Sequence, residues 1–245
     1  MQGPWSIYLV LGGMAVLVIG FTLMARRLER ARRAAIVELL SGLRFRLIME
    51  PDDDQRKAAF STVSHLSMLR DGYSGMQWIA RGFLDGRPTT IFEHRYSTGS
   101  GKSRVTHYNT VVALDAPREW PGVHLTAESM FDRLGEKLGA APDMRLEDPV
   151  FNKRWRVKCS GDETALAILT PSVQAVLQHA HADEWWVVGN GVLACGIGRQ
   201  LKAAQVRERI ERLNQIVAAS DPAVRELLPR LSREECEAAL RAGAR

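Results

Sequence analysis

The segment EWWVVGNGVLACGIG, residues 184–198, carries the clearest structural signal in this chain. Two apolar runs flank Asn190-Gly191, and an Asn-Gly pair between such runs is typical of a tight type I′ hairpin. We therefore expect two antiparallel strands, over residues 184–189 and 192–197.

Trp185 and Trp186 would point to opposite faces of the first of these strands. One of them can lie in the core and the other can be partly exposed. An exposed Trp is a candidate for a partner surface, but core packing is the simpler interpretation. Cys195, in the apolar run VLACGI, is interpreted as a small buried hydrophobic residue. With Cys159 and Cys236 it makes an odd number of cysteines without metal-binding spacing, which favours reduced thiols over a disulfide framework.

Five more strands are expected upstream, because β-branched and aromatic residues recur there between turn residues. They are QWIARGFL (77–84), TTIFEHRYS (89–97), RVTHYNTVVAL (104–114), VHLT (123–126) and KRWRVKC (153–159). Helical patterns cover residues 58–69, 127–139, 160–170, 172–180, 201–219 and 232–242. This order predicts an α+β fold with a mainly antiparallel sheet and flanking helices. A PH-like barrel is an alternative, although the helices between the fourth and sixth strands fit it poorly.

Residues 1–25 contain no Asp, Glu, Lys or Arg, and they are apolar nearly throughout from Trp5 to Ala25. Because roughly 20 helical residues cross a bilayer core of about 30 Å, we expect an amino-terminal transmembrane helix. A cleaved signal peptide is the alternative, but it would need a basic start and an apolar stretch of only about 7 to 15 residues.

A cluster of arginines follows this segment directly. The positive-inside rule then places the rest of the chain in the cytoplasm, on the inner (cytoplasmic) membrane. Each cation near an anionic leaflet gains on the order of 1 kcal/mol. We therefore expect contact with lipid head groups by Arg26, Arg27, Arg30, Arg32 and Arg33.

The basic character of the chain is local. The formal net charge is +5, and residues 26–50 alone hold seven Arg against three Glu. The remaining residues are thus near neutral, and no basic groove with interleaved aromatic residues appears among them. The sequence predicts no nucleic-acid partner.

These features divide the chain into four regions: a transmembrane anchor over 1–25, a basic helical linker region over 26–75, an α+β domain over 76–219 and a helical tail over 220–245. Within the second region an amphipathic helix is expected. Its apolar side chains near one face are Leu28, Ala31, Ala35, Leu39 and Leu43.

The segment STGSGKS (97–103) is similar to a phosphate-binding loop, but two features argue against one. The position of the first glycine in that motif is Tyr96. The residues after Ser103 alternate as a strand instead of opening a helix, and a helix amino terminus is what binds the phosphates. We interpret the segment as a hairpin connection and predict no nucleotide cofactor.

A hairpin centred on residues 100–101 would place His94 opposite His107 and Glu93 opposite Tyr108. Two imidazoles could hold a metal ion, but a zinc site needs three or four ligands, and Glu93 would lie on the other face. An ordinary polar pair is the simpler interpretation. Since no serine-elbow or cysteine–histidine motif occurs either, the sequence assigns no catalytic, cofactor-binding or metal-binding residue.

Three stretches together resemble a group of uncharacterised bacterial single-pass membrane proteins. They are FEHRYSTGSGKSRVTHYNTVVAL (92–114), MFDRLGEKLG (130–139) and FNKRWRVKCSGDETALAILTP (151–171). The resemblance implies a membrane-tethered cytoplasmic domain without an assigned activity, so it transfers no catalytic residue.

The function expected from the sequence is that of a membrane-anchored cytoplasmic interaction or scaffold domain, with the lipid bilayer and a protein as partners. The alternative is a membrane-tethered enzyme whose site lies near the 94–107 hairpin, around Lys102, His94 and His107. No grouping of residues favours the enzyme.

Overall fold

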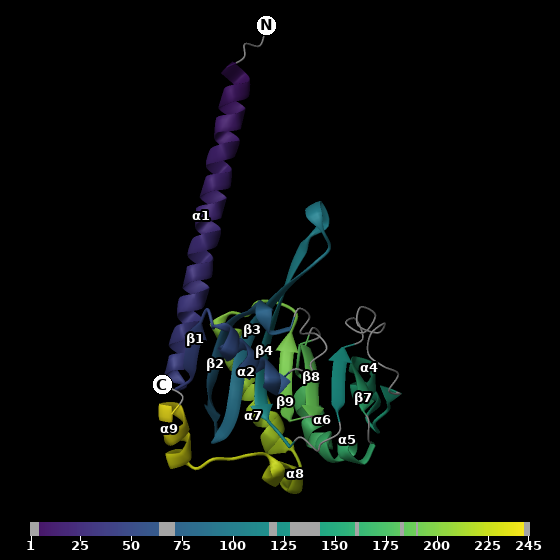
Figure 1. Ribbon diagram of the computed structural model, residues 1–245. Coiled ribbons are helices and arrows are strands. Elements are labelled where there is room, and N and C mark those ends of the chain that lie inside the picture. Colours follow the sequence, from purple (N-terminus) through teal and green to yellow (C-terminus); the bar gives the residue numbers. More distant parts are fainter. Residues whose placement is uncertain are drawn as a thin grey trace.

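A single antiparallel sheet organises the part of the chain that the computed structural model describes, residues 5–63, 72–117, 122–127, 143–159, 162–181, 184–189 and 191–242. Within these ranges the sheet has nine strands in the order β1-β2-β3-β4-β9-β8-β5-β7-β6. Every neighbouring pair is antiparallel. The sheet is open, so the barrel alternative is wrong, while the α+β class is confirmed (Figure 1).

The strands fall into two groups along the chain. The first four pair in sequence order: β1 Arg46–Met49, β2 Met76–Leu84, β3 Arg87–Thr98 and β4 Val105–Asp115. The second group is β5 Val123–Ala127, β6 Asp143–Met144, β7 Trp155–Cys159, β8 Glu184–Gly189 and β9 Val192–Ile197. β9 joins the two groups because it pairs with β4 on one side and with β8 on the other.

The β8–β9 hairpin has the bounds expected from the sequence. Gly189 and Val192 are the last pair of its ladder. Gly191 has a positive φ of 91°, which glycine adopts at little cost. Asn190 lies outside the described residues, as does most of the helix expected over 127–139.

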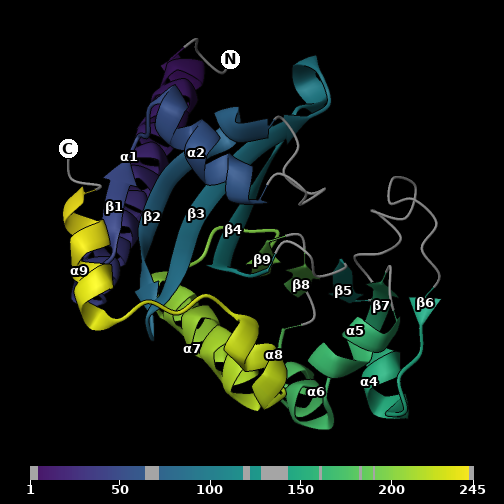
Figure 2. The same ribbon diagram turned by 60° about the horizontal axis from the view of Figure 1, so that its bottom comes forward.

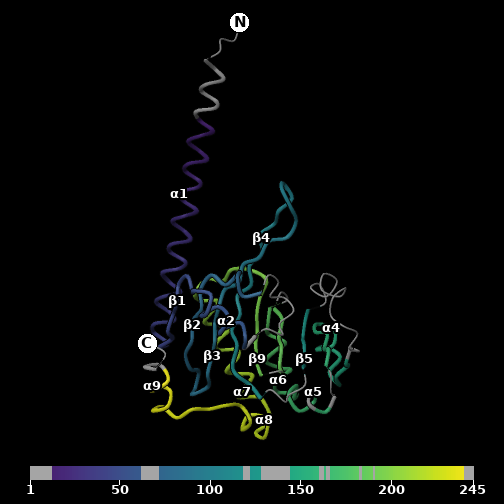
Figure 3. The backbone as a smooth tube through the Cα atoms, in the orientation of Figure 1, coloured from purple at the N-terminus to yellow at the C-terminus, as the bar shows by residue number. Residues whose placement is uncertain are grey.

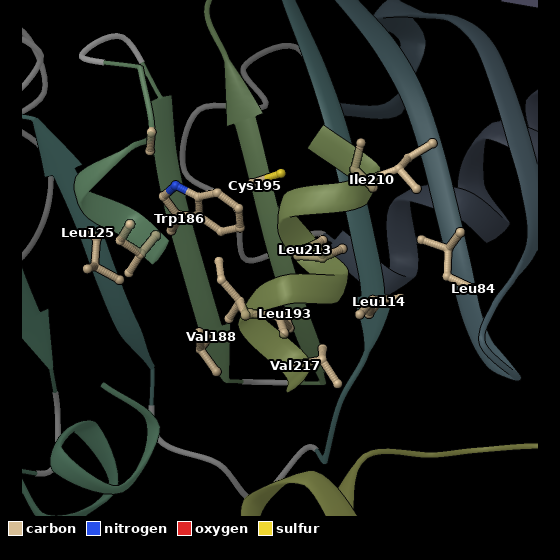
Figure 4. Close-up of a cluster of buried hydrophobic side chains, with 14 of the residues drawn as sticks. Leu84, Leu114, Leu125, Trp186, Val188, Leu193, Cys195, Ile210, Leu213 and Val217 are labelled. Carbon is tan, nitrogen blue, oxygen red and sulfur yellow. The ribbon is translucent and has the colours of Figure 1, made fainter. Parts of the chain in front are cut away.

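Helices cover both faces of the sheet (Figures 1 and 2). On one face, α1 Trp5–Gly42, α6 Pro171–Gln178 and α7 Ala203–Ala219 bury their apolar stripes in one cluster with the sheet. Figure 4 shows Leu213 and Val217 of α7 beside Leu193 and Leu114. On the other face, α2 Asp53–Val63 contributes Ala59 to a second cluster.

The remaining helices complete the described fold. They are η1 Gly72–Gly75, η2 Gly101–Ser103, α4 Pro149–Arg154, α5 Asp162–Ile168, α8 Pro222–Leu227 and α9 Arg233–Ala242. Thr170 caps α6, accepting a hydrogen bond from the Val173 amide, and Pro171 takes the first helical position.

The two adjacent tryptophans are both buried, at 1% exposure each. Trp185 packs in the cluster beneath α2, and Trp186 packs on the opposite face of the sheet. Core packing, the simpler interpretation, is therefore confirmed, and the alternative that one of them is exposed to a partner is wrong. Cys195 is also fully buried, as expected, and burial raises the pKa of its thiol.

The expectation of a transmembrane helix over residues 1–25 is wrong. Among the residues that the structure describes, no helix has both the length and the apolar character needed to cross a bilayer.

The carboxyl-terminal half of α1 belongs to the folded domain. Ile36, Leu39 and Leu40 are buried against the sheet, and Leu43 packs at the edge of the same cluster. These positions form an i, i+3, i+4, i+7 stripe. Leu28, which the sequence placed on the same face, is exposed instead.

Candidate functional site

The most unusual surface in the described part of the chain is residues 13–25 of α1, which we call the arm. Its large apolar side chains are 58% to 77% exposed, and they point in every direction around the helix. They are Met14, Val16, Leu17, Val18, Ile19, Phe21, Leu23 and Met24. Figures 1 and 3 show the arm projecting away from the sheet. Contiguous apolar exposure on this scale marks a binding surface.

The polar groups of the arm are satisfied within the helix. Thr22 is its one residue with a polar side chain, and the Thr22 hydroxyl donates a 2.7 Å hydrogen bond to the Val18 carbonyl. The backbone amides and carbonyls are bonded along the helix. The arm thus needs no water to complete its hydrogen bonds, and it suits an apolar environment.

Exposed cations begin where the arm ends. Arg26, Arg27 and Arg30 are all solvent-accessible. No ion pair involves any of the three within the residues that the structure describes. They form a positive collar between the arm and the folded domain.

Arg32 has a different place, although the sequence grouped it with the collar. Its guanidinium lies 2.9 Å from the carboxylate of Glu93 on β3, and it also donates to the Leu201 carbonyl. Glu93 is 1% exposed, and the Gln200 amide donates to its other oxygen. Arg32 therefore fixes α1 to the sheet.

Glu29 completes this ion-pair network. It accepts hydrogen bonds from Arg32 and from Arg33, the fifth arginine of the predicted group. The bond from Arg32, against some loss of hydration, keeps the pKa of Glu29 below its ordinary value. Burial opposes the charge of Arg32, but its bonds to Glu29 and Glu93 outweigh burial and raise the pKa of Arg32.

A second buried carboxylate holds α7 in the same way. Glu184 of β8 is fully buried and lies 2.8 Å from Arg209 and 3.2 Å from Arg212. Glu184 and Glu93 lie in one row across the sheet, through Thr110 and Ile197. The two covering helices are thus each held by arginine at the same level of the sheet, and neither pair was found from the sequence.

The β3–β4 hairpin has a different register from the one expected. His94 faces Asn109, and His107 faces Tyr96, on whose ring it stacks at 4.9 Å. The expected pairing assumed a tight turn, but the chain forms the single turn η2 between the strands, which moves the register by two residues. The two histidines are not cross-strand partners.

Each histidine has a structural contact of its own. His94 is buried, and its Nε2 donates a 2.9 Å hydrogen bond to the Gly72 carbonyl. His107 Nε2 is hydrogen-bonded to the Thr98 hydroxyl at 2.8 Å. Among the described residues, no group of three or more His, Cys, Asp or Glu side chains could hold a metal ion.

Lys102 lies in η2 at the hairpin tip and is exposed. A groove of about 440 Å³ beside this hairpin is lined by serines, glycines, Gln77, Arg95, Tyr96 and Arg104. Lys102, His94 and His107 are not among its lining residues in the described part of the chain. This groove therefore does not gather the three residues suggested for an enzyme.

Comparison with known proteins gives one likeness of fold. No family model and no curated protein matches this chain, so the resemblance to uncharacterised bacterial membrane proteins stays a prediction. A solved structure, the mycobacterial trehalose monomycolate transport factor A (TtfA), aligns with a TM-score of 0.50 and 16% sequence identity. The alignment covers 80% of this chain and 95% of that one, and the chain is thus similar to TtfA in fold.

Proposed function

We propose that this protein is an interaction domain that works at a lipid surface. The arm of α1 contacts the apolar part of the lipid, the collar contacts anionic head groups, and the α+β domain is presented to a protein partner. The surface concerned is the cytoplasmic face of the inner membrane. The observation that carries the proposal is the exposed arm followed directly by the collar.

The order of residues along α1 matches the change in polarity across a lipid surface, from the apolar interior to the charged head groups. Apolar side chains of the arm would leave water, and Arg26, Arg27 and Arg30 follow at the level of the head groups. Apolar burial contributes about 25 cal/mol per Å². Each cation adds on the order of 1 kcal/mol at an anionic leaflet. Together they account for both affinity and preference for anionic lipid.

The β3–β4 hairpin supports the same orientation. Its tip projects to the side on which the arm projects (Figures 1 and 3). Lys102 and Arg104 at the tip are exposed. A surface that contacts the arm would therefore also meet two further cations.

The likeness to TtfA in fold supports a general proposal for the biological role. TtfA is named as a transport factor for trehalose monomycolate. At 16% identity the likeness concerns fold, so the role that we propose for this chain is general: an accessory protein associated with lipid transport.

Flotation with liposomes tests the proposal. The full-length protein should float with vesicles containing phosphatidylglycerol more strongly than with pure phosphatidylcholine. Arg26→Glu with Arg27→Glu should lower partitioning to the anionic vesicles about tenfold or more, since two favourable charges become repulsive. Leu17→Asp with Phe21→Asp should abolish partitioning to both kinds of vesicle.

The matched control is Lys153→Glu with Arg207→Glu. It makes the same change of charge at exposed positions of α4 and α7. It should bind like the parent protein. Equal flotation of the parent, the arm variant and the collar variant would refute the proposal, provided that circular dichroism shows all of them folded.

A further inference from the structure

A groove lies on the sheet face that α2 partly covers, and none of its lining residues belongs to the arm. Its volume is about 590 Å³, within the range of small-molecule sites. The floor is formed by β1 to β4, and α2 and Ala239 of α9 form walls. Figure 2 shows α2 lying across these strands.

Two arginines stand side by side in this groove. Arg46 of β1 is directly opposite Arg81 of β2 in the antiparallel ladder. Like charges in directly opposite positions destabilise a sheet. Within the residues that the structure describes, no carboxylate lies within ion-pair distance of either guanidinium. Partial burial, with the charge of Arg46, lowers the pKa of Arg81. The pair is poised to receive an anion.

The remaining lining is mostly apolar or neutral. Ile48, Phe83 and Pro88 contribute apolar surface from the strands, and Ala58 does so from α2. Thr90, opposite Arg81 on β3, adds a hydroxyl. A ligand that fills the groove therefore meets cations at one part and hydrocarbon at another.

Asp115 of β4 also lines the groove, and its charge acts on Arg81. The formal charges of Arg46, Arg81 and Asp115 leave the groove positive. Asp115 competes with any anionic ligand for Arg81. Substitution of either arginine is therefore expected to weaken binding, whereas substitution of Asp115 is expected to strengthen it. A cluster with a purely structural role would not show this difference in sign.

We propose that this groove binds an amphipathic anion, a carboxylate or phosphate head carried on an aliphatic chain. The head accepts hydrogen bonds from the guanidinium groups of Arg46 and Arg81, for which planar oxyanions are the natural partners. The chain lies on Ile48, Phe83 and Pro88.

Isothermal titration calorimetry on the full-length protein tests this with four probes. Decanoate and decyl phosphate are each used below the critical micelle concentration, and 1-decanol and inorganic phosphate represent the chain and the head group alone. Decanoate or decyl phosphate should bind at least tenfold more tightly than decanol and than inorganic phosphate. The preferred head group identifies the source of the ligand. If decanol or inorganic phosphate binds as tightly as both anionic amphiphiles, or if neither amphiphile binds, the inference is overturned.

Substitutions locate the site. Arg46→Gln and Arg81→Gln should each weaken binding of the preferred probe about tenfold, and Asp115→Asn should strengthen it severalfold. Arg207→Gln, at an exposed position of α7, should have no effect. Both arginines are exposed enough for their variants to fold. Unchanged binding in the two arginine variants would sink the assignment.

The groove and the arm are tested independently. Leu17→Gln with Phe21→Gln removes apolar surface from the arm and should leave the Arg81-dependent binding unchanged. Loss of that binding in the arm variant would place the probe on the arm and overturn the assignment to the groove.

Discussion

At the scale of single residues, loss of the ion pair between Arg32 and Glu93 has a large expected effect on stability. Both side chains are nearly withdrawn from water, at 12% and 2% exposure. Removing Arg32 leaves the buried Glu93 carboxylate without its cationic partner, which costs about 3–5 kcal/mol. Arg32→Ala should lower the free energy of unfolding in urea by that amount.

Arg33→Ala is the matched control, because Arg33 pairs with the same Glu29 but is exposed. Surface pairs contribute about 0–1 kcal/mol. Equal losses in the two variants would show that Arg32 behaves as an ordinary surface cation. Arg32→Met combined with Glu93→Leu should recover much of the stability, since no buried charge then remains.

Gly196 of β9 is required by its neighbour. A Cβ atom there would overlap the ring of Trp185, which is buried and has no room to move. Gly196→Ala should therefore destabilise the protein by about 1–3 kcal/mol through overpacking, measured by thermal or urea unfolding. Gly198→Ala is the control, because the nearest atom to its Cβ is 3.9 Å away. Comparable unfolding curves for the two variants would contradict this account.

Asp115 gives a prediction about pH. Burial raises the pKa of its carboxyl, and Arg81 only partly offsets burial. The folded state then holds the proton more tightly than the unfolded state does, so a stabilising contribution present in acid is lost as pH rises through the folded pKa. Asp115→Asn should raise the free energy of unfolding at pH 7. The gain should vanish near pH 3, where the Asp115 carboxyl of the parent protein is protonated and is as neutral as the amide of the variant. A gain independent of pH would argue against burial as the cause.

At the scale of elements, most strands could be predicted from the sequence, but the two edge strands of the sheet, β1 and β6, could not. Alternation and turn residues identified β2 to β5 and β7 to β9, because those strands are long or bounded by clear turns. β1 and β6 have four and two residues, too few to show a period. The β3–β4 register was wrong because η2 lengthens a connection that reads as a tight turn.

The candidate site was predictable in part for a similar reason. An apolar run followed by arginines is local in the sequence, and both parts are exposed as a local pattern suggests. Arg32 looks like its neighbours, but its partner Glu93 is 61 residues away. The groove unites β1 to β4 with α2, and no spacing in the sequence reveals such an arrangement.

The start of α4 offers a test at this scale. The Asp148 carboxylate accepts hydrogen bonds from the amides of Val150 and Phe151, and it also accepts one from the Gln178 side chain of α6. Asp148→Ala removes the cap and the link between the helices, and should cost about 1–2 kcal/mol in urea unfolding. Asp148→Asn preserves a capping oxygen and should lose less. If both variants lose equally, charge matters more than capping.

At the scale of the whole molecule, α1 serves two separate purposes. Its arm is exposed, while Leu40 is completely buried in the domain. Leu17→Gln with Phe21→Gln should leave the thermal midpoint within about 1 °C, because these side chains make no core contact, yet reduce flotation with liposomes. Leu40→Ala should cost about 2–5 kcal/mol of stability and leave flotation of the folded protein unchanged. Coupled loss of both properties in either variant would contradict this division.

The position of β9 between β4 and β8 constrains how the protein is made. On the ribosome, β1 to β4 emerge early, and β4 then presents an unpaired edge until residues 192–197 have been synthesised. Such an edge recruits foreign strands. Pairing of β4 with β9 is therefore a late, long-range step of folding, and until the β8–β9 hairpin has been synthesised the edge of β4 is open to pairing with other chains.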